Sequence, residues 1–291
     1  MAHPFPLALP LALASCAPLL PGAALVSARE GSEQNPCLAP DGQTLVFTRF
    51  LEGYNEGPAA LMALDLGSGE ERTLIAAGDH DHVNMPGRCF SPDGYLLAYA
   101  SDEEERDEVW VLSLVDGESW RVTDRPGAGA LEPGFTADGE GLVYESEGRL
   151  WHAALDGRGE RAITDGSADD RQPSPHPLED RLVFQSTRGG TWGLWEVSLA
   201  GGDPTPLLDE DAEETDPSFS ADGGAVAFAT DACAGLSCIA AWRGDSTEIL
   251  AGEPGWYLGA PTQGADGTAW FEASKGDPEE TGATAIWRVD P

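Results

Sequence analysis

The segment GDHDHVN, residues 78 to 84, holds the side chains best suited to chemistry in this chain. His80, Asp81 and His82 are three consecutive potential metal ligands. Two histidines at positions i and i+2 of a strand share a face and could bind a metal if another segment supplied a third ligand. A polar loop without a ligand is the alternative, and we favour it. We therefore predict neither a metal nor a cofactor.

Two further segments contain residues that could bind a cation or act as a nucleophile. LDEDAEETD, residues 208 to 216, is rich in carboxylates, but it lacks the glycine and the ligand order of a dedicated calcium loop. A solvated loop is the favoured interpretation. GLSC, residues 235 to 238, lacks the final glycine of a G-x-S-x-G nucleophile motif. No residue set suggests a reaction, so no catalytic residue is predicted.

A repeat that runs through the whole chain must position any residues that bind a ligand. The motif CFSPDG (residues 89 to 94) recurs roughly every 40–50 residues. Its copies are PCLAPDG (36–42), RCFSPDG (88–94), PGFTADG (133–139), PSPHPLED (173–180), PSFSADG (217–223) and PTQGADG (261–267). Asp followed by Gly is typical of tight turns, because Gly tolerates a positive φ. SPDG is therefore predicted to be a turn of the scaffold.

Each turn is followed by short segments in which apolar and polar residues alternate with the period of a strand. The first of these read LVFTR, LAYAS, LVYES, LVFQS, VAFAT and AWFEAS, each with an aromatic residue near its centre. Two more strand-like segments follow in most copies, so each unit contains four short strands. Six such units predict an all-β fold, a six-bladed β-propeller of four-stranded antiparallel blades.

The ends of the repeat predict how the ring closes. The last copy stops after its third strand, and residues 23 to 37 resemble the segment in which a fourth strand leads into the next unit. Ala23 to Ser27 are therefore expected to supply the outer strand of the last blade. Residues 23–291 form the predicted propeller, residues 1–16 a signal peptide and residues 17–22 a short tether.

The segment FSPDGYLLAYASDEEERDEVWVLSLVDGESWRVTD and its weaker copies resemble the repeats of the TolB-type propeller family. The resemblance extends from residue 23 to the end of the chain. It implies a six-bladed ring in the bacterial cell envelope, often used as a binding platform. It covers the propeller alone, because no segment resembles the N-terminal α/β domain of TolB, and a true Tol role is not implied.

In a propeller, the residues just before each inner strand surround one mouth of the central channel, where an open site is most expected. Polar candidates at or near this mouth are Asn35, His80, His82, Arg88, Glu132, Gln172 and Asp216. They would bind a partner or a ligand. In the alternative interpretation, they only tie the loops of neighbouring blades together.

Charge and the N-terminal segment restrict partners and location. The formal net charge is −35, so nucleic acid and anionic lipid surfaces are not expected partners. MAHPFPLALPLALASC resembles a secretory signal, and LASC resembles the bacterial lipobox. We predict that lipid attached to Cys16 anchors the protein on the periplasmic side, at the outer membrane. An ordinary signal peptide that contains a cysteine is the alternative.

The other four cysteines would then lie in an oxidising compartment. Cys233 and Cys238 flank a short hairpin connection, which predicts a local disulfide. Cys37 and Cys89 occupy equivalent positions in adjacent blades. In a sixfold ring their Cα separation equals their distance from the axis, and a bond needs less than about 7 Å. This pair is left open.

The sequence thus favours a cell-envelope lipoprotein that acts as a non-catalytic platform for an unidentified envelope protein. An enzyme, such as a metal-dependent lyase or hydrolase acting at the channel mouth through His80 and His82, is the alternative. A third hypothesis is a passive structural module for a salty periplasm, which has no specific partner.

Overall fold

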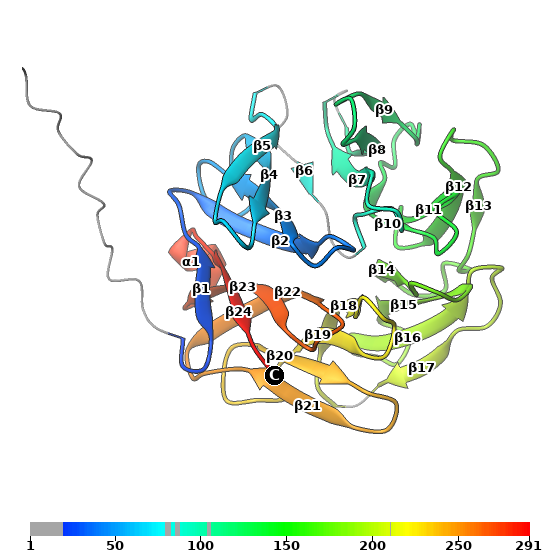
Figure 1. Ribbon diagram of the computed structural model, residues 1–291. Helices are drawn as coiled ribbons and strands as arrows, with labels where there is room; N and C mark the ends of the chain where they lie inside the picture. The colour runs from blue at the N-terminus through cyan, green and yellow to red at the C-terminus, as the bar shows by residue number, and fades with distance from the viewer. Residues whose placement is uncertain (1–19, 79–82, 85–87, 104–105, 210) are drawn as a thin grey trace, which may run out of the picture.

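The strands of the computed structural model form six four-stranded antiparallel sheets around a central axis (Figure 1). The structure describes residues 20–78, 83–84, 88–103, 106–209 and 211–291. Each sheet is one blade, with its strands ordered from the axis to the rim. The predicted six-bladed propeller is confirmed.

The four strand positions recur in every blade. The innermost strands are β2 (Ser32–Leu38), β6 (Val83–Asn84), β10 (Leu131–Phe135), β14 (Asp170–Pro175), β18 (Glu214–Phe219) and β22 (Trp256–Gln263). The second strands are β3 (Thr44–Phe50), β7 (Leu96–Ser101), β11 (Gly141–Glu145), β15 (Arg181–Ser186), β19 (Val226–Thr230) and β23 (Ala269–Lys275). The third strands are β4 (Ala59–Asp65), β8 (Glu108–Ser113), β12 (Leu150–Ala154), β16 (Gly193–Ser198), β20 (Cys238–Trp242) and β24 (Ala285–Val289). The outer strands are β5 (Glu71–Ile75), β9 (Ser119–Arg121), β13 (Arg161–Ala162), β17 (Thr205–Leu208), β21 (Thr247–Ala251) and β1 (Ala24–Ser27).

The SPDG motif is the turn between the first and second strands of a blade. Asp93 Oδ1 accepts hydrogen bonds from the Ser91 hydroxyl at 2.6 Å and from the Tyr95 N–H at 3.1 Å. Gly94 has φ of 76°, a left-handed conformation that favours glycine. This turn fixes the register of the two strands that it joins, so the motif has the scaffold role expected from its repetition.

One aromatic side chain at the centre of each second strand fills the space between blades. These residues are Phe47, Tyr99, Tyr144, Phe184, Phe228 and Phe271, none more than 2% exposed. Each belongs to a hydrophobic cluster, and several of these clusters combine residues of two neighbouring blades. Burial of each aromatic contributes on the order of 1.5–3 kcal/mol, so the period-2 pattern directly stabilises the blade seams.

The N-terminal strand closes the ring. β1, blue in Figure 1, lies beside the red β24, with Ala24 opposite Arg288 and Leu25 opposite Trp287. This confirms the strand expected at the outer edge of the last blade. Leu20, from the predicted tether, is 2% exposed and packs in the cluster that contains Trp287.

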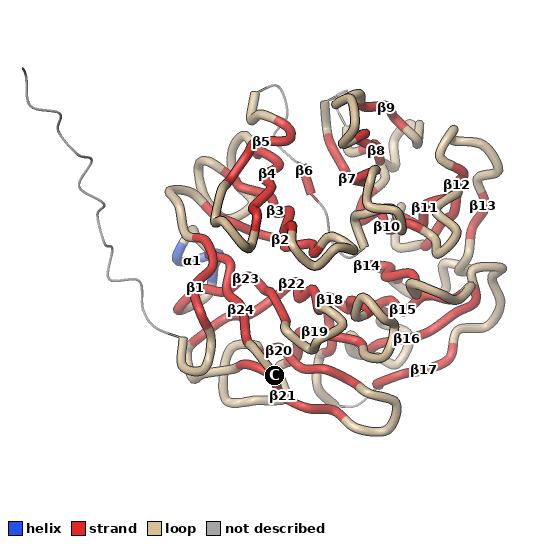
Figure 2. The backbone as a smooth tube through the Cα atoms, in the orientation of Figure 1, coloured by secondary structure: helices blue, strands red, loops and turns tan. Residues whose placement is uncertain are grey.

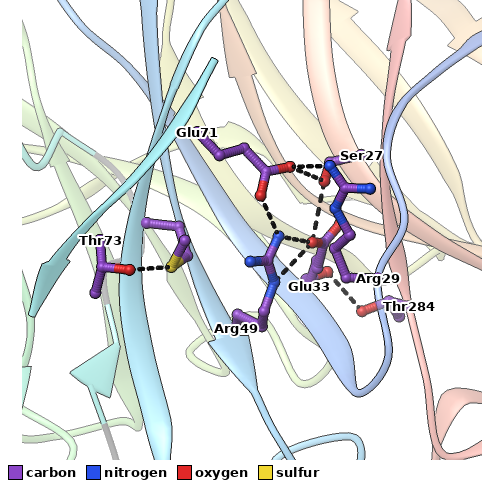
Figure 3. Close-up of polar contacts among 8 residues, drawn as sticks. Ser27, Arg29, Glu33, Arg49, Glu71, Thr73 and Thr284 are labelled. Carbon is purple, nitrogen blue, oxygen red and sulfur yellow. Dashed lines mark hydrogen bonds and ion pairs between the residues drawn. The ribbon is translucent and has the colours of Figure 1, made fainter. Parts of the chain in front are cut away.

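A polar cluster reinforces this closure at the seam between the last blade and the first (Figure 3). Ser27 Oγ lies 3.0 Å from Glu33 Oε1 and 3.2 Å from Glu71 Oε1. Arg29 donates to Glu71 at 3.1 Å, and Arg49 forms ion pairs with both glutamates. The closing strand is thus tied by side chains to strands β2, β3 and β5 of the first blade.

Helix contributes little to the described residues. α1 (Pro278–Thr281) is a single turn in the connection between β23 and β24 (Figure 2). Its N-cap is Asp277, which accepts a hydrogen bond from the Glu279 N–H. Within the described ranges, no helix has the length and apolar character to cross a bilayer.

Candidate functional site

Five of the six equivalent positions at the predicted channel mouth have an unusual backbone. Asn35, Glu132, Gln172, Asp216 and Ala260 have φ between 46° and 57°. A left-handed conformation is strained in residues other than glycine and persists where the surrounding structure holds it. A register shift in the inner strand lies at each of these positions.

The strain is offset by hydrogen bonds from blade to blade. The Gln172 N–H donates to Glu132 Oε2 at 2.5 Å, and the Asp216 N–H donates to Gln172 Oε1 at 3.0 Å. The Ala260 N–H donates to Asp216 Oδ2 at 3.0 Å. Each side chain therefore accepts from the backbone of the same position in the next blade.

The pattern changes where the last blade meets the first, because Ala260 has no polar side chain. Glu272 Oε2, from β23, instead accepts the Asn35 N–H at 2.9 Å. Glu272 Oε1 lies 3.3 Å from the Tyr257 hydroxyl, which lies 3.3 Å from the Tyr54 hydroxyl. We call Asn35, Glu132, Gln172, Asp216, Ala260 and Glu272 the mouth ring. Its bonds agree with the interpretation in which these groups tie neighbouring blades together.

Glu272 was not among the residues singled out from the sequence, but a signal for it exists. It directly follows the central aromatic Phe271 of its strand, as Glu145 follows Tyr144 and Gln185 follows Phe184. Gln185 Oε1 also accepts the Asp216 N–H, at 2.9 Å. A polar residue directly after the buried aromatic is thus a second position from which side chains reach the mouth ring.

The carboxyl groups of the mouth ring are poorly hydrated. Burial raises the pKa of Glu132 to about 8, against the lowering effect of the bond from Gln172. Burial also raises the pKa of Glu272 to about 8, and it raises the pKa of Asp216. Glu132 is enclosed by protein, although part of its surface stays accessible to solvent. Glu132 and Glu272 therefore hold their protons near neutral pH, which reduces repulsion among the carboxyl groups of the mouth ring.

A second set of blade-to-blade contacts lies two residues further along the inner strands. Cys37 and Cys89 are joined by a disulfide, with 6.3 Å between their Cα atoms. The Ser174 hydroxyl accepts the Phe219 N–H at 3.1 Å, and the Thr262 hydroxyl accepts the Leu38 N–H at 3.4 Å. A separate disulfide joins Cys233 to Cys238, with 6.4 Å between Cα atoms.

Arg88 does not lie with the mouth ring. It lines a cavity of about 90 Å³ further toward the turns that join first and second strands, together with Cys37, Ser218, Thr262 and Gln263. Burial lowers the pKa of Arg88 to about 10. The channel therefore has an acidic mouth and, two residues further along the inner strands, a cavity with a guanidinium.

His80, His82 and Cys16 lie outside the described residues, so the predicted histidine pair and lipidation site stay predictions. Within the described ranges, no group of three or more His, Cys, Asp or Glu side chains is arranged to hold a metal ion.

No protein-family model matches the chain. In sequence, it is 31% identical over 149 residues to the uncharacterized peptidase YuxL of Bacillus subtilis, which is 49% of this chain and 21% of that protein. The matches span about half or less of the curated relatives' own length.

Solved structures with the same fold cover most of the chain. A putative TolB from Agrobacterium tumefaciens superposes with a TM-score of 0.67 at 18% identity, over 92% of this chain and 93% of that one. TolB from Acinetobacter baumannii gives a TM-score of 0.62 at 16% identity, over 90% of this chain and 64% of that one. At these identities the likeness establishes a TolB-like propeller fold.

Proposed function

We propose that this propeller is a non-catalytic binding platform of the bacterial cell envelope, which holds a protein partner on the face that carries the mouth ring. The observation that carries the proposal is the blade-to-blade bonding of Glu132, Gln172, Asp216 and Glu272. These bonds hold the mouth rigid, and a rigid surface loses little conformational entropy when a partner binds. The same bonds occupy side chains that catalysis would need free.

The face around the mouth ring also carries apolar side chains suited to a protein contact. Leu51, in the loop between β3 and β4, is 47% exposed, and Leu236, in the loop between β19 and β20, is 50% exposed. Antiparallel topology places both loops at the end of the blades where the inner strands begin. The net charge of −35 favours a partner with basic groups.

Lipidation of Cys16 would place the platform against a membrane. Leu20 is buried in the propeller and follows Cys16 by four residues, a span of at most about 14 Å when fully extended. The propeller would therefore stay close to the bilayer, where a membrane-associated partner could reach it.

The proposal is tested by crosslinking in cells that express the native chain, Cys16→Ala, or the double variant Leu51→Ser with Leu236→Ser. The matched control is Val115→Ser with Leu178→Ser, because both residues are 74% exposed and lie in turns of the opposite face. We expect one stoichiometric envelope partner, reduced by Cys16→Ala and by the Leu51 and Leu236 changes but retained by the control. Equal recovery with all variants, or no partner at all, would contradict the platform.

An enzymatic role is the second candidate, and the match to an uncharacterized peptidase favours it. In that case His80 and His82 would bind a metal near the channel mouth. Metal analysis of the purified protein, with His82→Ala as the comparison, separates the two functions. A stoichiometric metal lost in the variant supports the enzyme, and the same metal content in both chains argues against it.

A further inference from the structure

In a chain dominated by acids, Arg88 is a cation without a carboxylate partner among the described residues. Most arginines in the described ranges pair with a carboxylate. Arg88 has no such pair among the described residues, and its buried Nε has no hydrogen-bond partner there. An enclosed guanidinium without a counter-charge is costly, so a bound anion would stabilise it.

The position of Arg88 is occupied differently in the other blades. There the residue after the mouth-ring position is a proline: Pro36, Pro133, Pro173, Pro217 and Pro261. Arg88 thus replaces a proline, a residue whose role in the repeat is to restrict the backbone conformation. Its backbone N–H makes no hydrogen bond within the described residues. A proline, which has no N–H, would therefore fit here as it does in the other blades.

The cavity offers further groups for a ligand. The Ser218 hydroxyl makes no hydrogen bond within the described residues, and Thr262 uses its oxygen as an acceptor and keeps its proton free to donate. In the part of the chain that the structure describes, Gln263 Oε1 is a buried acceptor without a donor, while its Nε2 donates to the Gly267 carbonyl at 2.9 Å. The cavity of about 90 Å³ exceeds several-fold the space that one water needs, roughly 10–15 Å³.

We propose that this cavity binds a carboxylate that carries a hydroxyl or amide N–H donor beside it, with the carboxylate on Arg88 and Ser218 and the donor on Gln263. A guanidinium matches the planar geometry of a carboxylate and forms strong charge-assisted hydrogen bonds with it. A small hydroxy acid and the C-terminus of a peptide both have this chemistry. The proposal does not depend on the binding of a protein partner at the mouth ring.

The test is calorimetric titration of the purified chain with sodium glycolate at constant ionic strength. We expect saturable binding, weakened by about tenfold or more in Arg88→Gln and Arg88→Pro, since a hydrogen bond to a charged group is lost. Arg158→Gln removes the same charge from a side chain that is 87% exposed and should bind as the native protein does. No saturable binding, or equal binding by Arg88→Pro, would overturn the proposal.

Melting temperatures separate loss of the site from loss of the fold. Arg88→Pro should melt at least as high as the native protein without ligand, because it restores the residue of the other blades and removes an unpaired charge. Glycolate should raise the melting temperature of the native chain but not that of this variant. A glycolate-induced rise of the same size in both would contradict the site.

Comparison of ligands identifies the source of the carboxylate. Acetate has no donor and should bind more weakly than glycolate; equal binding would remove Gln263 from the proposed site. Tetraglycine should bind and tetraglycine amide should not if the natural ligand is a chain terminus. If glycolate binds and tetraglycine does not, the natural ligand of the cavity is a small free acid.

Discussion

Glu272 should make the stability of this protein depend on pH. Its pKa is raised by burial from an ordinary value near 4.5 to about 8 in the folded protein. Between these values the folded state keeps a proton that the unfolded state releases, so stability falls as pH rises through this interval. Below about pH 4.5 both states are protonated, and above about pH 8 the loss is complete.

Glu272→Gln should remove this part of the pH dependence, because the amide oxygen can still accept the Asn35 N–H. We expect the variant to be more stable than the native protein at pH 8.5 by several kcal/mol, up to about 5 kcal/mol for a shift from 4.5 to about 8, with little difference at pH 5. Chemical denaturation at both pH values measures this. The matched control is Glu140→Gln, an exposed glutamate, which should show no such change. A Glu272→Gln effect of equal size at both pH values would contradict the assignment.

At the scale of elements, the closing strand β1 should contribute strongly to stability. Deletion of residues 17–29 removes the pairing with β24, the buried Leu20 and the Ser27 and Arg29 bonds. We expect the free energy of unfolding to fall by several kcal/mol, because a large buried side chain and the pairing of a whole strand are lost together. Thermal and denaturant unfolding measure this, and unchanged melting of the deletion would rule the closure out.

Two point variants separate packing from general damage to this segment. Leu20→Ala should cost about 2–5 kcal/mol, because the side chain is buried at 2% exposure. Leu25→Ala, in the strand itself and 43% exposed, should cost well under half of that. Equal losses from the two changes would show that Leu20 is not anchored in the blade.

The elements that recur in the sequence were predictable, because one physical pattern produces each. Alternation of apolar and polar residues around a central aromatic predicts the strands of the blades, and the Asp–Gly turns predict the connections between them. The Cys37–Cys89 bond could not be decided, because sequence does not give the radius of the ring.

The candidate site was predictable only in part. The repeat predicts that Glu132, Gln172 and Asp216 occupy equivalent positions. It does not predict the direction of their hydrogen bonds. That direction depends on a left-handed backbone at residues that rarely adopt it, and no residue type marks it in the sequence. Arg88 is close to the mouth-ring positions in the chain, whereas its side chain lines the cavity further along the inner strands.

At the scale of the whole molecule, charge should limit stability at low ionic strength. A net charge of −35 repels itself in the compact state, and salt screens this repulsion over about 8 Å at physiological ionic strength. We expect the melting temperature to rise by roughly 5 °C or more between 10 mM and 0.5 M sodium chloride.

A matched variant distinguishes screening from other effects of salt. Glu70, Glu118, Glu140 and Glu248 are exposed, and changing all four to glutamine lowers the charge without touching the core. This variant should show a smaller rise with salt and a higher melting temperature at low salt. A melting temperature that does not change with salt in either protein would refute the electrostatic explanation.

The pairing of β1 with β24 also determines when the fold can be completed. Ala24 leaves the ribosome about 260 residues before its partner Arg288, which is roughly 10–50 s at ordinary rates of synthesis. During that time the first strand has no native neighbour at its hydrogen-bonding edge, and the growing blades lack their final seam. Completion of the ring is therefore a late event that waits for the synthesis of β24, and until then the growing chain exposes strand edges that a chaperone would need to cover.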